Sequence, residues 1–346
     1  MPIIKKPSEH FDAKIRTGAG GGSVTVSGVG FQPDLVWTKS RSQAYDHMLA
    51  DSVRGTTKAL RTNLTASELT ADSWGYLSAF NSDGYTAVPG SANFQSYGTS
   101  GVTYVDWMWK AGGTAVTNNN GSIQSQVSVN STAGFSIVSY DSGAAGDKTV
   151  GHGLSSTPKL IITKARNGSS YNWAIYHSSV IDSVTKFLRF TTDAVVTSSA
   201  IWGAALPTST VFGITSGNGV EENKNCIAYC WSEVEGYSKF GQYTGTGAGE
   251  TTNTPFIYCG FRPAFIIVKT LASGYNWAIM DTDRPGYNSI SYRIMADVSN
   301  EETTSGDPQL DFLSNGFKLR AGNANYAGTN LYMAFAESPF KYASAR

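Results

Sequence analysis

Short apolar runs with alternating aromatic residues recur along the whole chain, separated by turns rich in Gly, Ser, Asn and Pro. Short runs of this kind, spaced roughly 8–12 residues apart, are typical of the strands of a β-sandwich or jelly roll. Helical periodicity is confined to residues 52–63 and 179–188, each bounded by small polar residues, and predicts single helical turns there. The pattern therefore predicts an all-β protein.

One pattern occurs three times. In each copy a proline precedes a short apolar run, and a lysine closes the run six residues after that proline. These pairs are Pro33 and Lys39, Pro158 and Lys164, and Pro263 and Lys269. Because proline is tolerated at the first residue of a strand, each run predicts a strand that starts at its proline. We expect Leu35, Leu160 and Phe265 to occupy equivalent strands of three related β-sandwich domains.

The repeat continues beyond the lysine. A tyrosine follows six or seven residues later, and a polar residue that ends the next predicted strand stands six residues after it. These pairs are Tyr45 and Asp51, Tyr171 and His177, and Tyr275 and Asp281. The second and third copies also share Tyr-Asn-Trp-Ala-Ile, at 171–175 and 275–279. Since several features recur at nearly fixed spacing, we interpret them as an internal triplication.

These landmarks divide the chain into six parts. They are an N-terminal arm at 1–10, a sandwich at 11–110, a linker at 111–133, a sandwich at 134–238, a sandwich at 239–340 and a C-terminal tail at 341–346. The linker is predicted from its high content of Gly, Asn, Ser and Thr, with one strand at 123–129. A chain of 346 residues exceeds the roughly 250–300 that one core supports, which agrees with several domains.

Charge and hydropathy exclude several classes of partner. Lys plus Arg and Asp plus Glu number 26 each, so no net charge indicates nucleic-acid binding. No run of 18 apolar residues occurs, which excludes a membrane-spanning helix, and the first residues carry no signal-peptide pattern. We therefore expect no nucleic acid, no membrane insertion, and synthesis in a cytoplasm without export.

The residue types that bind metals or form disulfides show no matching arrangement. Cys226 and Cys230 stand four apart in a predicted strand, roughly 13 Å, whereas a disulfide spans at most about 7 Å between Cα atoms. With Cys259, we expect three reduced thiols. The four histidines form no spaced set and no Asp-x-Asp-x-Asp-Gly loop occurs, so we expect no metal and no cofactor. A calcium ion held between loops is the alternative.

Five short segments have distinctive sequences. They are Gly-Phe-Ser-Ile-Val-Ser-Tyr at 134–140, Thr-Val-Gly-His-Gly-Leu at 149–154, Gly-Tyr-Ser-Lys-Phe-Gly at 236–241, Asp-Phe-Leu-Ser-Asn-Gly-Phe-Lys-Leu-Arg at 311–320 and Ser-Pro-Phe at 338–340. Together they resemble a domain of tailed-phage structural proteins, especially marine ones. The resemblance implies concanavalin-type, lectin-like jelly rolls and a virion component, either a tail fibre, a head fibre or a decoration protein. It implies no catalytic residues.

The aromatic residues separate into two groups. Trp173 and Trp277 occupy the same place in two copies, so we interpret them as core residues. Six others have no counterpart, and several stand beside Gly, Ser or Asn in predicted loops, where sugar rings can stack. These candidates for binding glycans or partner proteins are Trp74, Tyr76, Tyr97, Trp202, Tyr287 and Tyr326. The alternative is that they fill interfaces between domains.

Two carboxylate pairs are candidates for glycoside hydrolysis. Glu233 with Glu235, and Asp281 with Asp283, stand two residues apart, on one face of an extended chain. Retaining glycosidases need carboxyls about 5–5.5 Å apart and inverting ones about 6.5–9.5 Å, so spacing alone does not exclude catalysis. Asp281 aligns with the residue that ends the same strand in the other copies, which favours a turn role. We expect no catalytic residue; the alternative is a virion-associated glycan depolymerase.

The expected function is that of a non-enzymatic virion structural protein. Its expected partners are other virion proteins, with host-surface glycans as additional ligands of the loop aromatics. The chain contains 18 Tyr and 8 Trp, residue types that anchor protein interfaces, and its sandwiches have strand edges that neighbours can cover. We therefore expect a homo-oligomer, a trimer if the protein is a fibre.

Overall fold

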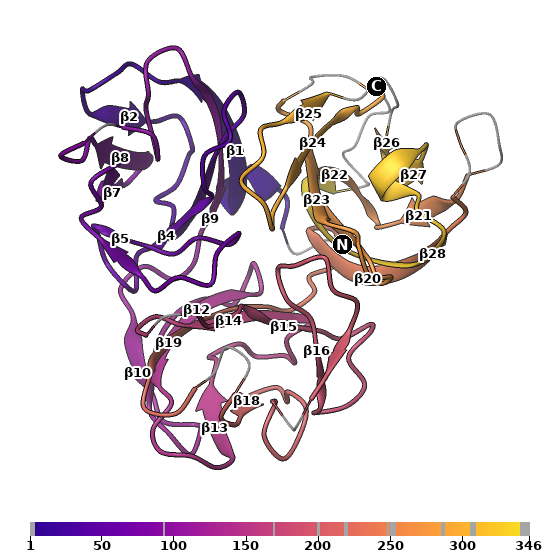
Figure 1. Cartoon of the computed structure of the whole chain (residues 1–346). Helices are drawn as coiled ribbons and strands as arrows, with labels where there is room; N and C mark the ends of the chain where they lie inside the picture. The colour runs from indigo at the N-terminus through magenta and orange to yellow at the C-terminus, as the bar shows by residue number, and fades with distance from the viewer. Residues whose placement is uncertain are drawn as a thin grey trace.

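In the computed structural model, three β-units surround a common centre (Figure 1). The structure describes residues 4–92, 94–168, 170–198, 201–217, 221–247, 249, 254–284, 288–304 and 309–339. The strand pairs that build its sheets are antiparallel. The all-β prediction is therefore confirmed.

Unit 1 is drawn in indigo and purple in Figure 1. It consists of the 3-10 turn η1 (Pro7–Glu9) and the strands β1 (Phe11–Thr17), β2 (Val24–Val26), β3 (Leu35–Ser40), β4 (Met48–Asp51), β5 (Lys58–Ala59), β6 (Leu69–Thr70), β7 (Tyr76–Asn81), β8 (Gly84–Val88) and β9 (Thr103–Trp109). Its main sheet has the order β1-β9-β3-β4, and a smaller sheet has the order β2-β8-β7. Val36 and Met108 of the main sheet share a buried cluster with Leu77 and Tyr85 of the smaller one, which makes this unit a β-sandwich.

Unit 2 is drawn in magenta. Its strands are β10 (Val116–Asn118), β11 (Ser125–Asn130), β12 (Phe135–Asp141), β13 (Lys148–Gly151), β14 (Leu160–Ala165), β15 (Ala174–His177), β16 (Lys186–Phe187), β17 (Val196–Thr197), β18 (Val211–Ile214) and β19 (Asn225–Trp231). The main sheet has the order β10-β11-β12-β19-β14-β15, and β13-β18 and β16-β17 form two-stranded sheets.

Unit 3 is drawn in orange and yellow. It consists of the strands β20 (Ser238–Gly245), β21 (Phe256–Tyr258), β22 (Phe261–Thr270), β23 (Trp277–Asp281), β24 (Tyr292–Met295), β25 (Thr303–Thr304), β26 (Leu310–Leu313), β27 (Gly316–Leu319) and β28 (Gly328–Pro339) and the 3-10 turn η2 (Gly322–Ala324). The main sheet has the order β20-β28-β22-β23-β24-β25, and the smaller sheet has the order β21-β27-β26.

The three main sheets share one four-strand pattern: β1-β9-β3-β4, β12-β19-β14-β15 and β20-β28-β22-β23. The partners of the expected equivalent residues also correspond: Leu35 pairs with Asp51 and Trp109, Leu160 with His177 and Trp231, and Phe265 with Asp281 and Phe335. The three residues therefore occupy equivalent strands in the same register, as the repeat predicts. This register defines the equivalent positions named below.

An aromatic core at the centre joins all three units. The ring centroid of Trp109 in unit 1 lies 6.3 Å from that of Trp231 in unit 2 and 5.5 Å from that of Phe265 in unit 3. Every residue of β3, β14 and β22 is buried, and one continuous buried cluster extends through the three units. Strands buried on both faces read as unbroken apolar runs, which explains why these segments do not alternate.

Residues 111–133 are not a free linker, contrary to the prediction. They contribute β10 and β11, and every residue of β11 pairs with β12. The predicted strand at 123–129 is close to β11, but its polar composition concealed that it belongs to a sheet. Ser125 and Ser128 are buried with satisfied hydroxyls: Ser125 Oγ donates to the carbonyl oxygen of Gly151 at 2.8 Å, and Ser128 Oγ accepts from the amide of Gly112 at 2.9 Å.

The segments expected to form helical turns contain short strands instead. Residues 52–63 include β5 and residues 179–188 include β16, each followed by a bridge back to the main sheet, between Leu60 and Leu49 and between Leu188 and Ile175. The apolar side chains whose spacing had suggested helical turns are buried at these bridges instead. No helix in the described part of the chain is long and apolar enough to span a membrane.

The three cysteines are free and buried, as expected from their spacing. Cys226 and Cys230 lie on β19 in the main sheet of unit 2, and Cys259 lies in unit 3. Burial raises the pKa of each thiol, to about 12 for Cys226 and Cys259. Because the thiolate is the reactive form, these three residues act as small apolar side chains.

Candidate functional site

The structure separates the six candidate aromatics by exposure. Trp74 is 41% exposed, Tyr76 is half-buried at the start of β7, and Tyr326 is half-buried with its ring centroid 4.2 Å from that of Tyr275. Tyr287 lies outside the described residues. Among the described candidates, Trp74 therefore has the most accessible ring.

Tyr97 and Trp202 are buried, which corrects their prediction as surface platforms. Trp202 is 0% exposed, packs its ring edge-on to Tyr176, and donates from Nε1 to the carbonyl oxygen of Lys186 at 2.9 Å. Tyr97 is 1% exposed and lies against Phe94. Both rings fill the cores of their own units, so neither can stack on a sugar. Their lack of counterparts reflects different packing in each unit.

Trp74 lines a pocket of about 190 Å³ on the surface of unit 1. Around it stand side chains that both donate and accept hydrogen bonds: Tyr45, Asp46, Arg61, Asp72 and Gln95. Arg61 Nη1 lies 3.1 Å from Asp46 Oδ2, which fixes the geometry of both groups. An exposed aromatic ring beside a few positioned polar groups is a common arrangement for small polar ligands with one apolar face.

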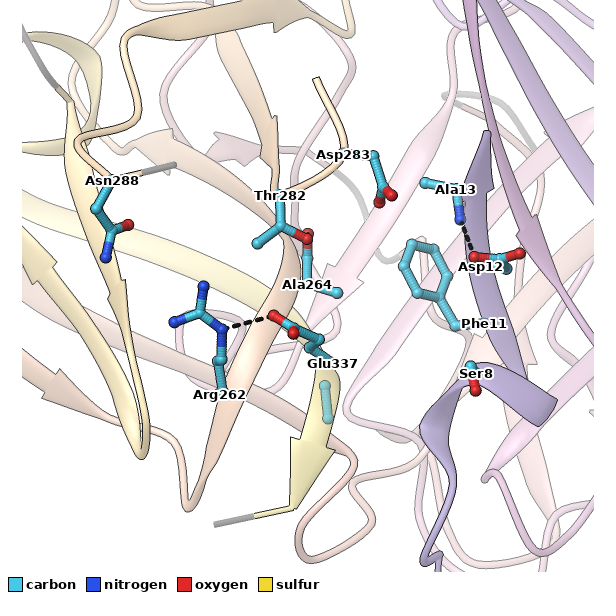
Figure 2. A pocket seen from close by; sticks show the side chains of 11 residues that line it. Ser8, Phe11, Asp12, Ala13, Arg262, Ala264, Thr282, Asp283, Asn288 and Glu337 are labelled. Atoms are coloured by element: carbon cyan, nitrogen blue, oxygen red, sulfur yellow. Dashed lines mark hydrogen bonds and ion pairs between the residues drawn. The ribbon is translucent and has the colours of Figure 1, made fainter. Parts of the chain in front are cut away.

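A second pocket, of about 340 Å³, lies between units 1 and 3. Figure 2 shows Asp283 and Glu337 of unit 3 facing Phe11 and Asp12 of unit 1 across it, with Arg262 beside Glu337. Arg262 Nε and Glu337 Oε2 are 2.5 Å apart, so the guanidinium of Arg262 forms an ion pair with that carboxylate. The pocket is thus acidic on both walls, and only the assembly of two units creates it.

Asp283 has the most perturbed carboxyl of this acidic pocket. The residue as a whole is exposed, but the pocket walls hinder the solvation of its charged carboxylate, and the negative charges of Asp281 and Asp12 add to this effect, which raises its pKa to about 7. Burial also raises the pKa of Asp12, although Lys14 Nζ lies 2.6 Å from Asp12 Oδ2. Sequence reasoning paired Asp283 with Asp281 and missed Asp12, because Asp12 belongs to a distant strand, β1.

Of the other candidate carboxylates, Glu233 and Asp281 are held in structural contacts. Glu233 pairs with Lys239 at 2.7 Å, and Glu235 is exposed. Asp281 is completely buried, and Oδ2 accepts both from Arg284 Nε at 2.7 Å and from Trp107 Nε1 at 2.8 Å. A carboxylate enclosed in this way cannot reach a substrate. Asp281 therefore has a structural role.

The contact between Asp281 and Trp107 belongs to a cyclic set. Each unit's strand-ending polar residue reaches the next unit. Asp51 Oδ2 accepts from Tyr229 Oη at 2.7 Å, Asp281 Oδ2 accepts from Trp107 Nε1, and His177 Nε2 donates to the carbonyl oxygen of Tyr332 at 3.1 Å. Trp107 and Tyr229 are equivalent, and their counterpart in unit 3 is Met333, which has no side-chain donor. The backbone therefore takes part at that interface instead.

A second cyclic set runs in the opposite direction. Trp173 Nε1 donates to the carbonyl oxygen of Arg61 at 3.0 Å, and Trp277 Nε1 donates to that of Arg189 at 2.8 Å. His47, the equivalent residue in unit 1, places Nε2 2.9 Å from the carbonyl oxygen of Met295. Because Trp37 Nε1 donates to His47 Nδ1, His47 must carry its proton on Nε2 and donate there. The recurring Tyr-Asn-Trp segment thus serves the interfaces.

The lysine that closes each repeated run is buried. Burial lowers the pKa of Lys39 to about 7 and those of Lys164 and Lys269 to about 8. Lys39 Nζ donates to the carbonyl oxygen of Ser40 at 2.8 Å, whereas Lys164 Nζ donates across the interface to that of Thr65 at 3.1 Å. These lysines therefore stabilise turns and unit contacts rather than attracting a polyanion.

The comparison with known protein families decides the family of this chain. A family described as a domain of unknown function, DUF7483, matches residues 6–339. The chain belongs to this family. No curated protein and no solved structure matches the chain. Since the matched segment contains all three units, the DUF7483 domain corresponds to the whole three-unit ring and not to a single sandwich.

The described residues of this DUF7483 chain include no group of three His, Cys, Asp or Glu side chains placed to hold a metal ion. What the two pockets offer is hydrogen bonding. The Trp74 pocket combines a ring face with donors and acceptors, and the Asp283 pocket combines a carboxyl that titrates near neutrality with further carboxylates. The first arrangement is suited to binding, and the second carries the features that proton transfer requires.

Proposed function

We propose that this protein is a non-enzymatic structural component of a phage particle, either a tail fibre, a head fibre or a decoration protein. The observation that carries the proposal is the closed ring of three units, each joined to the next through buried contacts at equivalent positions. The resemblance of several segments to tailed-phage structural proteins supports it. In this proposal the units are concanavalin-type jelly rolls, and the ring is a rigid block that other virion proteins hold in place.

The ring uses its ionisable residues for assembly, which supports a structural role. Asp51 is bound by Arg54 of its own unit and by Tyr229 of unit 2. Asp281 is bound by Arg284 of its own unit and by Trp107 of unit 1, and the side chains of both ion pairs are fully buried. Breaking such a buried pair leaves an uncompensated charge, so these contacts give the ring a defined geometry. A particle component that must persist outside a cell benefits from such rigidity.

The proposed ligand of the outer surface is a host-surface glycan, bound at the Trp74 pocket. A pyranose ring presents an apolar face that packs on an indole, and its hydroxyls can pair with Asp46, Asp72 and Gln95. Trp74→Ala should weaken glycan binding about tenfold or more. Tyr258→Ala, which removes another exposed ring on β21, is the matched control and should leave binding unchanged. Equal effects of both variants would argue against this assignment.

The virion location is tested on particles. Antibodies against the purified protein, coupled to gold, should label intact phage particles at one repeated position under the electron microscope. Mass spectrometry of gradient-purified particles should detect the chain at a level comparable with other structural proteins. Finding the chain only in the unassembled fraction of the lysate would overturn the proposal.

A glycan depolymerase is the second candidate, and the pocket between units 1 and 3 favours it. A carboxyl with a pKa of about 7, such as that of Asp283, is suited to act as a general acid, and Asp12 supplies a facing carboxylate. Asp283→Asn tests this alternative. If the structural proposal holds, the variant and the wild type show the same level of polysaccharide cleavage; an at least tenfold loss, about 1.4 kcal/mol in the barrier, would establish the enzyme.

A further inference from the structure

A third pocket, of about 250 Å³, lies where the three units meet. Each unit contributes the same two positions to its lining. Leu49 bridges to Leu60, Ile175 to Leu188, and Ile279 pairs with Ile294. The third and fourth residues after these partners line the pocket: Asn63 and Leu64, Thr191 and Thr192, and Asp297 and Val298. The pocket therefore lies on the pseudo-threefold axis of the ring that Figure 1 shows. We call it the axial pocket.

The three equivalent polar residues of the axial pocket differ in how they are satisfied. Asn63 Oδ1 accepts from the amide of His47 at 3.0 Å, and Asn63 Nδ2 donates to Asp46 Oδ1 at 2.6 Å. Thr191 Oγ1 donates to Asp193 Oδ2 at 2.8 Å. Asp297 Oδ1 accepts from the amide of Trp277 at 3.0 Å, in the same way as Asn63. Its second oxygen, Oδ2, is buried and has no donor among the described residues.

Asp297 is 8% exposed, so this open acceptor lies in a nearly enclosed place. Asn276, which also lines the pocket, has a buried Oδ1 that likewise lacks a donor among the described residues. Leaving a buried acceptor unpaired costs about 1–3 kcal/mol, and two in one pocket indicate a missing donor-bearing partner. At two of the three equivalent positions the polar side chain is hydrogen-bonded within its own unit, whereas Asp297 keeps one acceptor oxygen without a donor among the described residues.

The charges around the axial pocket favour a neutral partner. The charges of Lys269 and Asp297 interact although the two residues form no direct ion pair, so a positive charge already stands near the carboxylate. A cation would compete with this buried ammonium, whereas a hydroxyl can donate to Oδ2 without adding charge. Trp173 and Phe190 supply an apolar wall, and Leu64 and Thr192 stand at its exposed rim. Polar acceptors and an aromatic wall within one pocket fit the two kinds of surface of a sugar ring.

We propose that the axial pocket binds a neutral polyhydroxylated molecule of monosaccharide size, whose hydroxyls donate to Asp297 Oδ2 and Asn276 Oδ1. The site is distinct from the Trp74 pocket and exists only in the assembled ring. Its ligand is held by groups from all three units, so binding also stabilises the ring against separation of the units.

The probes are glucose, galactose, mannose and N-acetylglucosamine at millimolar concentration, measured by saturation-transfer NMR on the full chain. At least one should bind the wild type. Asp297→Asn replaces the open acceptor by a donor and should weaken that binding roughly tenfold or more. Thr192→Trp, a change at the exposed rim, should block entry without altering the core. Tyr258→Ala removes an exposed ring that lines neither pocket, so it is the matched control and should leave this binding unchanged.

Three results would overturn the assignment: no sugar of the panel binds, both axial variants bind as the wild type does, or only Trp74→Ala loses binding. Calcium binding that depends on Asp297, without sugar binding, would replace the hydroxyl ligand by a cation and would equally overturn it. If Asp297→Asn unfolds, as near-ultraviolet circular dichroism would reveal, Thr192→Trp alone decides. A glycan bound through Trp74 alone would support the proposed function while contradicting the axial site.

Discussion

Trp107 Nε1 donates a hydrogen bond to Asp281 Oδ2 across the interface between units 1 and 3, at 2.8 Å and in complete burial. The same oxygen also accepts a hydrogen bond from Arg284 Nε. The pair shows how the repeated polar residue at the end of a strand works: it ends its own strand and is bound by the next unit. The contact occurs twice with a side-chain donor from the next unit, at Trp107 and Tyr229. Where Met333 replaces them, His177 donates to the carbonyl oxygen of Tyr332 instead.

The first prediction concerns this contact. Trp107→Phe removes the donor and should lower the free energy of unfolding by about 1–3 kcal/mol, because a buried acceptor loses a partner. Asp281→Ala should lower it by about 3–5 kcal/mol, because it leaves Arg284 buried with less compensation. Met333→Leu, at the equivalent position without a donor, should cost less than about 1.5 kcal/mol. Denaturant titration measures all three; equal losses for Trp107→Phe and Met333→Leu would refute the idea.

The second prediction follows from a difference between the interfaces. Arg166 Nε binds Glu68 Oε2 at 2.9 Å between units 2 and 1, and Arg41 Nη2 binds Glu302 Oε2 at 2.8 Å between units 1 and 3. At the remaining interface all the equivalent positions are apolar. Leu271 occupies the position equivalent to Arg41 and Arg166, and Val195 the position equivalent to Glu68 and Glu302. Val180 occupies the position equivalent to Arg54. All three charged positions are apolar together at this interface, so none of these replacements leaves an opposite charge without its partner.

We therefore expect Leu271→Arg to destabilise the ring by at least about 2 kcal/mol, since the new cation meets valines where the other interfaces have a glutamate. Leu271→Arg combined with Val195→Glu should recover part of this loss through the restored pair. A double-mutant cycle on these two positions measures the coupling, and the Arg166 and Glu68 pair is the natural reference. Zero coupling in the engineered pair, with measurable coupling in the natural one, would contradict the equivalence.

The third prediction concerns acid stability. Burial lowers the pKa of His177 to about 4, whereas the unfolded residue titrates near 6.5. Between these values the unfolded chain binds a proton that the folded chain does not, so stability from this residue is present above pH 6.5 and declines as the pH falls towards 4. His177→Gln should abolish about 2–3 kcal/mol of that decline. Asp283 and Asp297, whose pKa values are raised, act in the opposite direction, so the variant must be compared with the wild type at each pH.

The fourth prediction concerns assembly. The chain was expected to form a homo-oligomer, a trimer if it is a fibre, and one chain already closes a ring of three related units around its centre. Light scattering at tens of micromolar tests whether copies associate further. A mass of about three times 36.9 kDa would support a fibre-like trimer, whereas a mass of 36.9 kDa would assign repetition on the particle to contacts with other virion proteins.

Sequence spacing alone determined the all-β class, the three copies and the register of their central strands. The spacing from Pro33 to Lys39, and from Tyr45 to Asp51, depends on consecutive residues of one strand and its neighbour. Such local relationships can be predicted from the sequence because strand geometry repeats every two residues. The polar composition of 111–133 hid β10 and the pairing of β11 with the main sheet, since buried serines satisfied by hydrogen bonds look like loop residues in a sequence.

Tertiary structure alone decided which aromatics are exposed and which residues meet between units. Nothing beside Trp74 or Trp202 in the chain distinguishes a surface ring from a buried one, because burial depends on segments far away in sequence. The same holds for Asp283 facing Asp12 and for Asp281 bound to Trp107. The axial pocket needs all three units together, so its open acceptor at Asp297 becomes visible only when packing shows that Asn63 and Thr191 are satisfied and Asp297 is not.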